Sequence, residues 1–169
     1  YKDGDYEAAS DAFKRCYTSY PKGMYTESAY FYAAESLYES SPEPRLDQTP
    51  TMAAIKAYQD FLDIFPHTKR RSETHERMIA LQDKLVMKEY HSAKLYYNLG
   101  SFDKMRNNYQ ACIVTAENAL KDYPYTKLRE DLTILILRAK FQMAKNSVED
   151  KKVDRYRDAI DEYYAFKNE

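Results

Sequence analysis

The chain has 169 residues with 26 Lys or Arg against 27 Asp or Glu, so its net charge is −1. A protein that binds nucleic acid usually carries a basic excess, and this balance argues against that class. With 3 glycines and 6 prolines, the sequence also lacks the turn residues that an antiparallel sheet needs. No run of about 18 apolar residues is present, so we expect no transmembrane helix. We therefore expect an all-α protein.

Three segments of the sequence end in an aromatic residue followed by proline. They are Tyr20-Pro21, Phe65-Pro66 and Tyr123-Pro124. When the prolines are aligned, a small residue recurs at Ala9, Ala54 and Cys112. A small residue lets two helices approach closely, and a proline after the helix prevents its continuation. This self-similarity predicts a stack of helix hairpins.

The first of these segments resembles the tetratricopeptide (TPR) family. Gly4, Tyr6, Ala9, Phe13 and Cys16 follow the spacing of the second helix of such a repeat. The resemblance implies a TPR-like α-solenoid of antiparallel helix hairpins that forms a right-handed superhelix. We expect one array over 1–169, divided into a half repeat 1–22 and hairpins 23–66, 67–124 and 125–169.

Helical periodicity places seven helices along the chain. We expect them at residues 5–19, 23–39, 50–65, 67–99, 102–123, 126–146 and 151–167. The longest loop is 40–47, after which Thr49 is expected to cap a helix that has Pro50 at its first position. The segment 67–99 contains neither glycine nor proline. It is interpreted as one helix about 48 Å long, with a break near Lys88 as the alternative.

The helix expected at 102–123 carries an insertion. Gly100 precedes Pro124 by 24 residues, whereas Gly4 precedes Pro21 by 17. Seven extra residues make two helical turns and nearly preserve the buried face, so we expect them to lengthen the helix. The apolar run Ile134–Leu137 could form a buried strand. A lone strand among helices would lack a pairing partner, which favours a helix. In the last helix Ala159, Tyr163 and Phe166 repeat the small and aromatic positions.

No catalytic residue, metal site or cofactor site is predicted. The three histidines, His67, His75 and His91, lie eight and sixteen residues apart, whereas zinc ligands on one helix are three or four apart. Cys16 and Cys112 occupy apolar stripes of separate repeats, so we expect two free, buried thiols. The protein is not expected to be an enzyme.

Interface-type residues suggest a partner-binding surface instead. The candidates are Tyr96, Tyr97, Asn98, Arg106, Asn107 and Asn108. The alternative interpretation is that Tyr97 packs in the core and the others are merely exposed.

A narrower resemblance rests on Tyr90, Ala93, Tyr96 and Tyr97, followed by Gly100 and the run Asp122–Thr126. These residues resemble the BamD family, the TPR lipoproteins of the outer-membrane β-barrel assembly (BAM) complex. The resemblance implies a scaffold that helps to assemble and insert β-barrel proteins. Its implied partners are the POTRA domains of BamA, other BAM lipoproteins and unfolded outer-membrane proteins. It also implies a position on the periplasmic face of the outer membrane, through a lipid anchor absent from this chain. We interpret the chain as a fragment of that longer protein.

The sequence departs from this family at one position. Thr115 stands where the family tends to place a basic residue, and Arg106, Lys127 and Arg129 are the neighbouring cations that could substitute for it. Two other functions stay open. One is a soluble, co-chaperone-like module that binds peptides, and the other is an envelope TPR protein linked to cell division or peptidoglycan synthesis.

Overall fold

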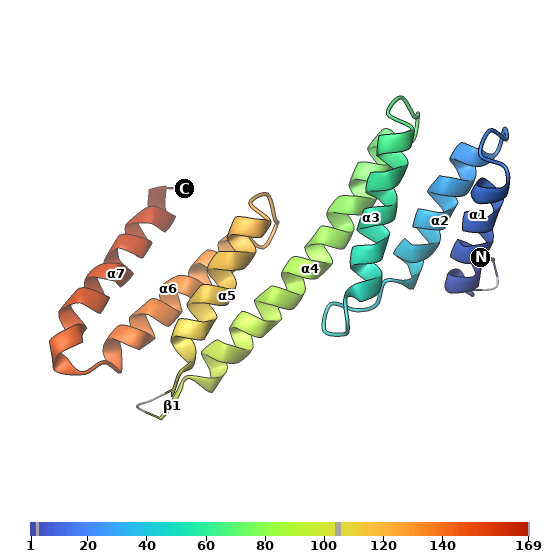
Figure 1. Cartoon of the computed structure of the whole chain (residues 1–169). Helices are drawn as coiled ribbons and strands as arrows, with labels where there is room; N and C mark the ends of the chain where they lie inside the picture. The colour runs from blue at the N-terminus through green and yellow to red at the C-terminus, as the bar shows by residue number, and fades with distance from the viewer. Residues whose placement is uncertain (3, 104–105, 169) are drawn as a thin grey trace. The chain divides into compact units, whose positions relative to one another are not determined.

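The computed structural model describes residues 1–2, 4–103 and 106–168, without the side chains of 101–106. Over these residues the fold is all-α apart from one small hairpin, which confirms the predicted fold class (Figure 1). The helices are α1 (Tyr6–Ser19), α2 (Thr26–Ser40), α3 (Thr49–Ile64), α4 (Arg71–Leu99), α5 (Asn108–Asp122), α6 (Arg129–Lys145) and α7 (Glu149–Asn168). The strands are β1 (Ser101–Asp103) and β2 (Arg106–Asn107).

The chain forms two compact units, Tyr1–Leu85 (unit 1) and Val86–Glu169 (unit 2). In unit 1, α2 packs against both α1 and α3, and in unit 2, α6 packs against both α5 and α7. Within each unit, consecutive helices run in opposite directions, as helix hairpins do (Figure 1). The right-handed superhelix and the division into a half repeat and three hairpins stay predictions.

The long helix is confirmed, because α4 runs unbroken through Lys88. The predicted cap of α3 is wrong in detail. Gln48 is the N-cap residue, and Thr49 already lies in the helix, with its hydroxyl donating to Oδ1 of Asp47 at 3.0 Å. The run Ile134–Leu137 lies in α6, so the helical interpretation is also confirmed.

The seven-residue insertion does not lengthen the helix before Pro124. Its residues, 101–107, contain the antiparallel strands β1 and β2, in which Ser101 pairs with Asn107. The chain leaves α4 through Gly100 at a φ of +60°, a conformation that suits glycine. Asn107 then caps α5 through Gln110 N–H at 3.4 Å, and the Asn108 amide donates to the Gly100 carbonyl at 2.9 Å. These short polar side chains start the helix six residues later than expected.

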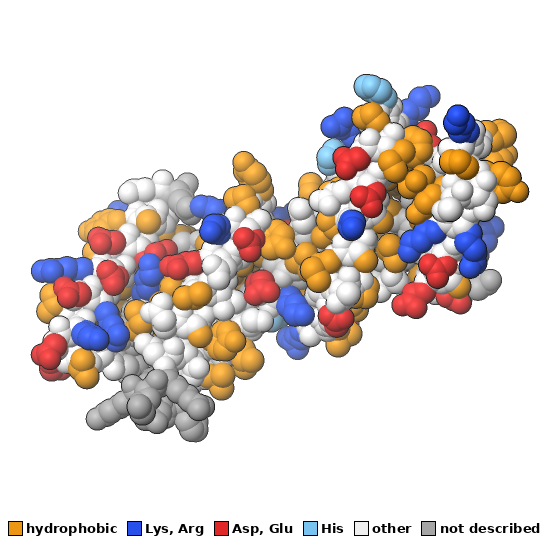
Figure 2. Space-filling view, viewed as in Figure 1, with side chains coloured by type: hydrophobic (Ala, Val, Ile, Leu, Met, Phe, Trp, Pro, Cys, Tyr) orange, Lys and Arg blue, Asp and Glu red, His pale blue; other side chains and the backbone are white. Residues whose placement is uncertain are grey.

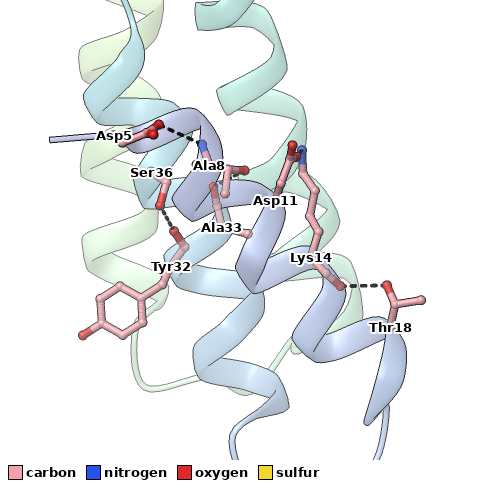
Figure 3. Close-up of polar contacts among 9 residues, drawn as sticks. Asp5, Ala8, Asp11, Lys14, Thr18, Tyr32, Ala33 and Ser36 are labelled. Atoms are coloured by element: carbon pink, nitrogen blue, oxygen red, sulfur yellow. Dashed lines mark hydrogen bonds and ion pairs between the residues drawn. The ribbon is translucent and has the colours of Figure 1, made fainter. Parts of the chain in front are cut away.

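Unit 1 begins with a capped helix that is packed on one side. Asp5 accepts from the N–H of Ala8 at 3.1 Å and caps α1, as Figure 3 shows. The buried hydroxyl of Ser10 donates to the Ala33 carbonyl of α2 at 3.2 Å. Among the described elements α1 packs substantially only against α2. The expectation of a buried Cys16 is therefore wrong, since this thiol is exposed.

The core of unit 1 is aromatic and encloses one charged group. Phe31, Tyr58, Phe61 and Leu81 are fully or almost fully buried. Their helices, α2, α3 and the first half of α4, are thus held by one cluster. Next to it lies the buried Glu35, whose carboxylate accepts from the Tyr58 hydroxyl and pairs with Arg77 at 2.8 Å.

The core of unit 2 relies on small residues between closely packed helices. Ala93 of α4, Ala116 of α5 and Ala139 of α6 are completely buried, in one cluster with Leu132 and Cys112. Small side chains at these crossings let the helix axes approach, as the repeat pattern predicts.

The two thiols should react at very different rates. Burial raises the pKa of the Cys112 thiol from 9.0 to about 11, although a backbone hydrogen bond from Tyr97 partly opposes this. Near pH 8 roughly one such thiol in a thousand is ionised, and the site is closed to reagents. We expect a thiol-reactive disulfide reagent to label Cys16 rapidly and Cys112 only on unfolding, as peptide mass spectrometry would show. Because the pKa of this thiol is higher in the folded state, its contribution to the free energy of unfolding is fully present below pH 9. That contribution is lost as the pH rises through 11. Equal labelling of both thiols in the native protein would contradict the packing of unit 2.

Candidate partner-binding surface

Unit 2 contains an apolar groove of about 430 Å³ between α6, α7 and the end of α4. Its apolar and aromatic lining consists of Tyr97, Leu137, Phe141, Tyr156, Ala159, Ile160 and Tyr163. Leu137 and Phe141 are four residues apart on α6, and Tyr156, Ile160 and Tyr163 step by four and three on α7. Residues at these spacings lie on one face of a helix.

The groove exists because α6 is apolar on more than one side. Leu132, Ile136 and Ala139 are buried in the core of unit 2. Leu137 and Phe141 therefore form a second apolar strip beside the first. The Phe141 ring meets Tyr156 of α7 edge to face, with centroids 6.1 Å apart. This contact helps to define the groove walls.

The groove keeps much of its apolar surface in water. Phe141 is 48% exposed, Ile160 52% and Tyr163 48%. Removing apolar area from water contributes about 25 cal/mol per Å², so a partner that covers these side chains gains several kcal/mol of hydrophobic free energy. Contiguous apolar patches of this kind mark interaction sites.

The groove is also lined by a cationic side chain, that of Arg138. Arg138 is exposed and makes no ion pair with the part of the chain that the structure describes. A guanidinium presents its donors in a planar fork that matches a carboxylate. The groove can therefore accept apolar side chains together with an acidic group.

Ion pairs hold α7 in place from the other side of α6. Lys140 lies 2.6 Å from Glu162 of α7 and 3.8 Å from Glu117 of α5. Lys140 and Glu162 are each 19% exposed, so solvent only partly screens this pair. These contacts link α5, α6 and α7 and fix the walls of the apolar groove.

The structure brings only one of the predicted contact residues into the groove. Tyr97 lines it, and its ring also packs edge to face on Tyr109 at 5.8 Å. Tyr96 and Asn98 are exposed elsewhere on α4. Asn107 and Asn108 make the capping and loop hydrogen bonds described above, so both have structural roles. The side chain of Arg106 lies outside the described residues.

Lys127 and Arg129 are separate from this surface. Both are exposed at the connection between α5 and α6, and Arg129 donates to the Pro124 carbonyl at 3.5 Å. The 15 residues of α5 span about 22 Å between this connection and Asn108. The structure therefore places these two cations away from Tyr97.

Sequence reasoning missed most of the groove. The sequence pattern does not single out Arg138, Phe141 or Ile160. It places Tyr163 at a repeat position, although this side chain is half exposed. The signal that could have found the groove is the second apolar strip of α6. Its residues, Leu137 and Phe141, lie four positions apart and beside the strip that enters the core.

Among the residues that the structure describes, no helix has the length and apolarity that a membrane span requires. In the same residues, no three His, Cys, Asp or Glu side chains gather as metal ligands would.

The profile of the YfiO family, described as outer membrane lipoprotein, matches residues 1–155. This range includes α1 to α6 and the beginning of α7. No curated protein matches the chain.

Proposed function

This chain belongs to the YfiO family of outer membrane lipoproteins, and we propose that it is a non-enzymatic scaffold for the assembly and insertion of β-barrel proteins. Membership of this family supports an association of the chain with the outer membrane. The family is not a family of enzymes. The membership also agrees with the resemblance to BamD-like proteins. A position on the periplasmic face of the membrane, and partners within the BAM complex, belong to the proposal.

We further propose that unit 2 docks the POTRA region of BamA through the groove. The observation that carries this proposal is the half-exposed apolar lining formed by Phe141, Ile160 and Tyr163. Large aromatic side chains in a pocket supply most of the binding energy at protein interfaces. Arg138 would pair with an acidic residue of the partner at the edge of the contact.

Binding of the purified chain to the POTRA region of the same organism's BamA tests this function. We expect Phe141→Ala and Tyr163→Ala each to weaken binding about tenfold or more, as truncation of central aromatic residues does. Arg138→Gln should weaken binding and reduce its dependence on salt. Biolayer interferometry on variants with unchanged circular dichroism would measure these affinities.

Val114→Ala is the matched control, because Val114 is 45% exposed on α5 and does not line the groove. Its affinity should equal that of the parent chain. If both proteins are folded and do not bind, the proposed function is wrong. If they bind and the groove variants bind equally well, the partner docks elsewhere.

A further inference from the structure

One end of unit 1 exposes large apolar side chains beside cations, and we call this surface the tip. The tip comprises the connection between α1 and α2 and the connection between α3 and α4. Figure 2 shows hydrophobic, basic and histidine side chains together where these connections lie in Figure 1. Its exposed apolar side chains are Tyr20 (71%), Met24 (85%), Tyr25 (67%) and Ile64 (49%).

The two connections form one ordered surface. The Thr68 hydroxyl donates to the Glu27 carboxylate at 2.6 Å, which links the second connection to α2. The Tyr30 and Phe65 rings pack edge to face at 5.6 Å, and Arg70 lies over the Phe31 ring at 4.3 Å. These contacts hold the apolar side chains and the cations of the tip side by side.

The tip is basic in a chain that is slightly acidic. Residues 20–27 and 63–71 contain four Lys or Arg and two carboxylates, Glu27 and Asp63, so this surface carries +2 while the whole chain carries −1. Lys22 and Lys69 are exposed and form no ion pair with the residues that the structure describes. Glu27 accepts from the Thr68 hydroxyl and pairs with neither lysine, so both ammonium groups can attract an external anion.

We propose that the tip binds the surface of an anionic phospholipid membrane. Tyrosine is favoured at the level of the headgroups, where the ring is apolar and the hydroxyl stays wet. Met24 between Tyr20 and Tyr25 would enter the boundary of the acyl chains, while Lys22 and Lys69 attract anionic headgroups. Lysine is depleted at protein interfaces, whereas Tyr and Met are enriched there, so the test below includes a protein partner as an outcome.

This inference rests on the family membership, because an outer membrane lipoprotein works next to a phospholipid surface. It does not depend on the groove, which lies in unit 2. The two sites can be tested separately.

Vesicle sedimentation measures the tip directly. We expect the chain to bind vesicles that contain phosphatidylglycerol, and to bind less as salt rises or when the lipid is only phosphatidylcholine. Lys22→Gln and Lys69→Gln should each lower the partition coefficient about fivefold. Met24→Ser with Tyr25→Ser should remove most of the remaining binding.

Met52→Ser is the matched control, because Met52 is 55% exposed at the opposite end of α3. It should bind vesicles like the parent chain.

The proposal is overturned if phosphatidylglycerol vesicles do not bind the chain, or if the tip variants bind as the control does. It is also overturned if the tip variants lose POTRA binding and keep vesicle binding, which would assign the tip to a protein. Since POTRA binding is measured without lipid, its failure is distinct from a failure here.

Discussion

Glu35→Ala is expected to lower the free energy of unfolding by about 3 kcal/mol. The Glu35 side chain is only 7% exposed, and its two oxygens serve Tyr58 and Arg77. Alanine would leave a buried hydroxyl without an acceptor and a guanidinium without its counterion. The Nε of Arg77 is buried and already lacks a hydrogen-bond partner, so the guanidinium is incompletely satisfied even when Glu35 is present.

Solvent moderates this effect. The Arg77 side chain is 35% exposed and also lies over the Tyr38 ring at 4.6 Å, so it keeps some stabilisation after Glu35 is lost. We therefore place the loss at the lower end of the range for broken buried pairs. Tyr58→Phe removes only the hydroxyl and should cost about 1–2 kcal/mol.

Urea denaturation of the two single variants and of the double variant would measure the coupling between Glu35 and Tyr58. Glu39→Ala is the matched control on the same helix, because Glu39 is exposed, and it should change stability by less than about 0.5 kcal/mol. A loss at Glu35 no larger than at Glu39 would mean that the carboxylate does not hold unit 1 together.

The same cluster makes unit 1 sensitive to alkali. Burial first, and then the hydrogen bond to Glu35, raise the pKa of Tyr58 above its ordinary value of 10.0. The phenol therefore stays protonated in the folded state where it would ionise in the unfolded one. Its contribution to stability is fully present below pH 10 and decreases as the pH rises further.

The sequence predicted the helices well because each carries its own periodic pattern. The pairing of Glu35 with Arg77 could not be predicted, since these residues are far apart in sequence and on different helices. The hairpin at 101–107 was missed for a local reason. Its length alone suggested two helical turns, whereas the Asn107 and Asn108 side chains bond the backbone and begin the helix after them.

The groove shows a different limit. The sequence predicts a contact role for Tyr97 but not for Phe141 or Ile160, because an apolar residue on a helix normally belongs to the core. Which apolar strip becomes the core depends on the neighbouring helices. On α6 the strip with Leu132 and Ile136 is buried, and the strip with Leu137 and Phe141 is left at the surface.

The largest loss of stability is expected from Phe61→Ala, about 3–5 kcal/mol. Phe61 is fully buried, and its ring contacts Phe31 and Phe65 with centroids 5.6 Å apart in each case. Alanine would remove the ring from the centre of unit 1 and leave a cavity among α2, α3 and α4.

The repeat itself supplies the control for this substitution. Cys16 occupies the position of Phe61 in the aligned repeats, but α1 is packed on one side only and Cys16 is exposed. Cys16→Ala should therefore change the free energy of unfolding by less than about 0.5 kcal/mol. Urea denaturation of both variants would compare the same repeat position in two environments. A loss below about 1 kcal/mol for Phe61→Ala would contradict the aromatic core of unit 1, and a loss of several kcal/mol for Cys16→Ala would contradict the one-sided packing of α1.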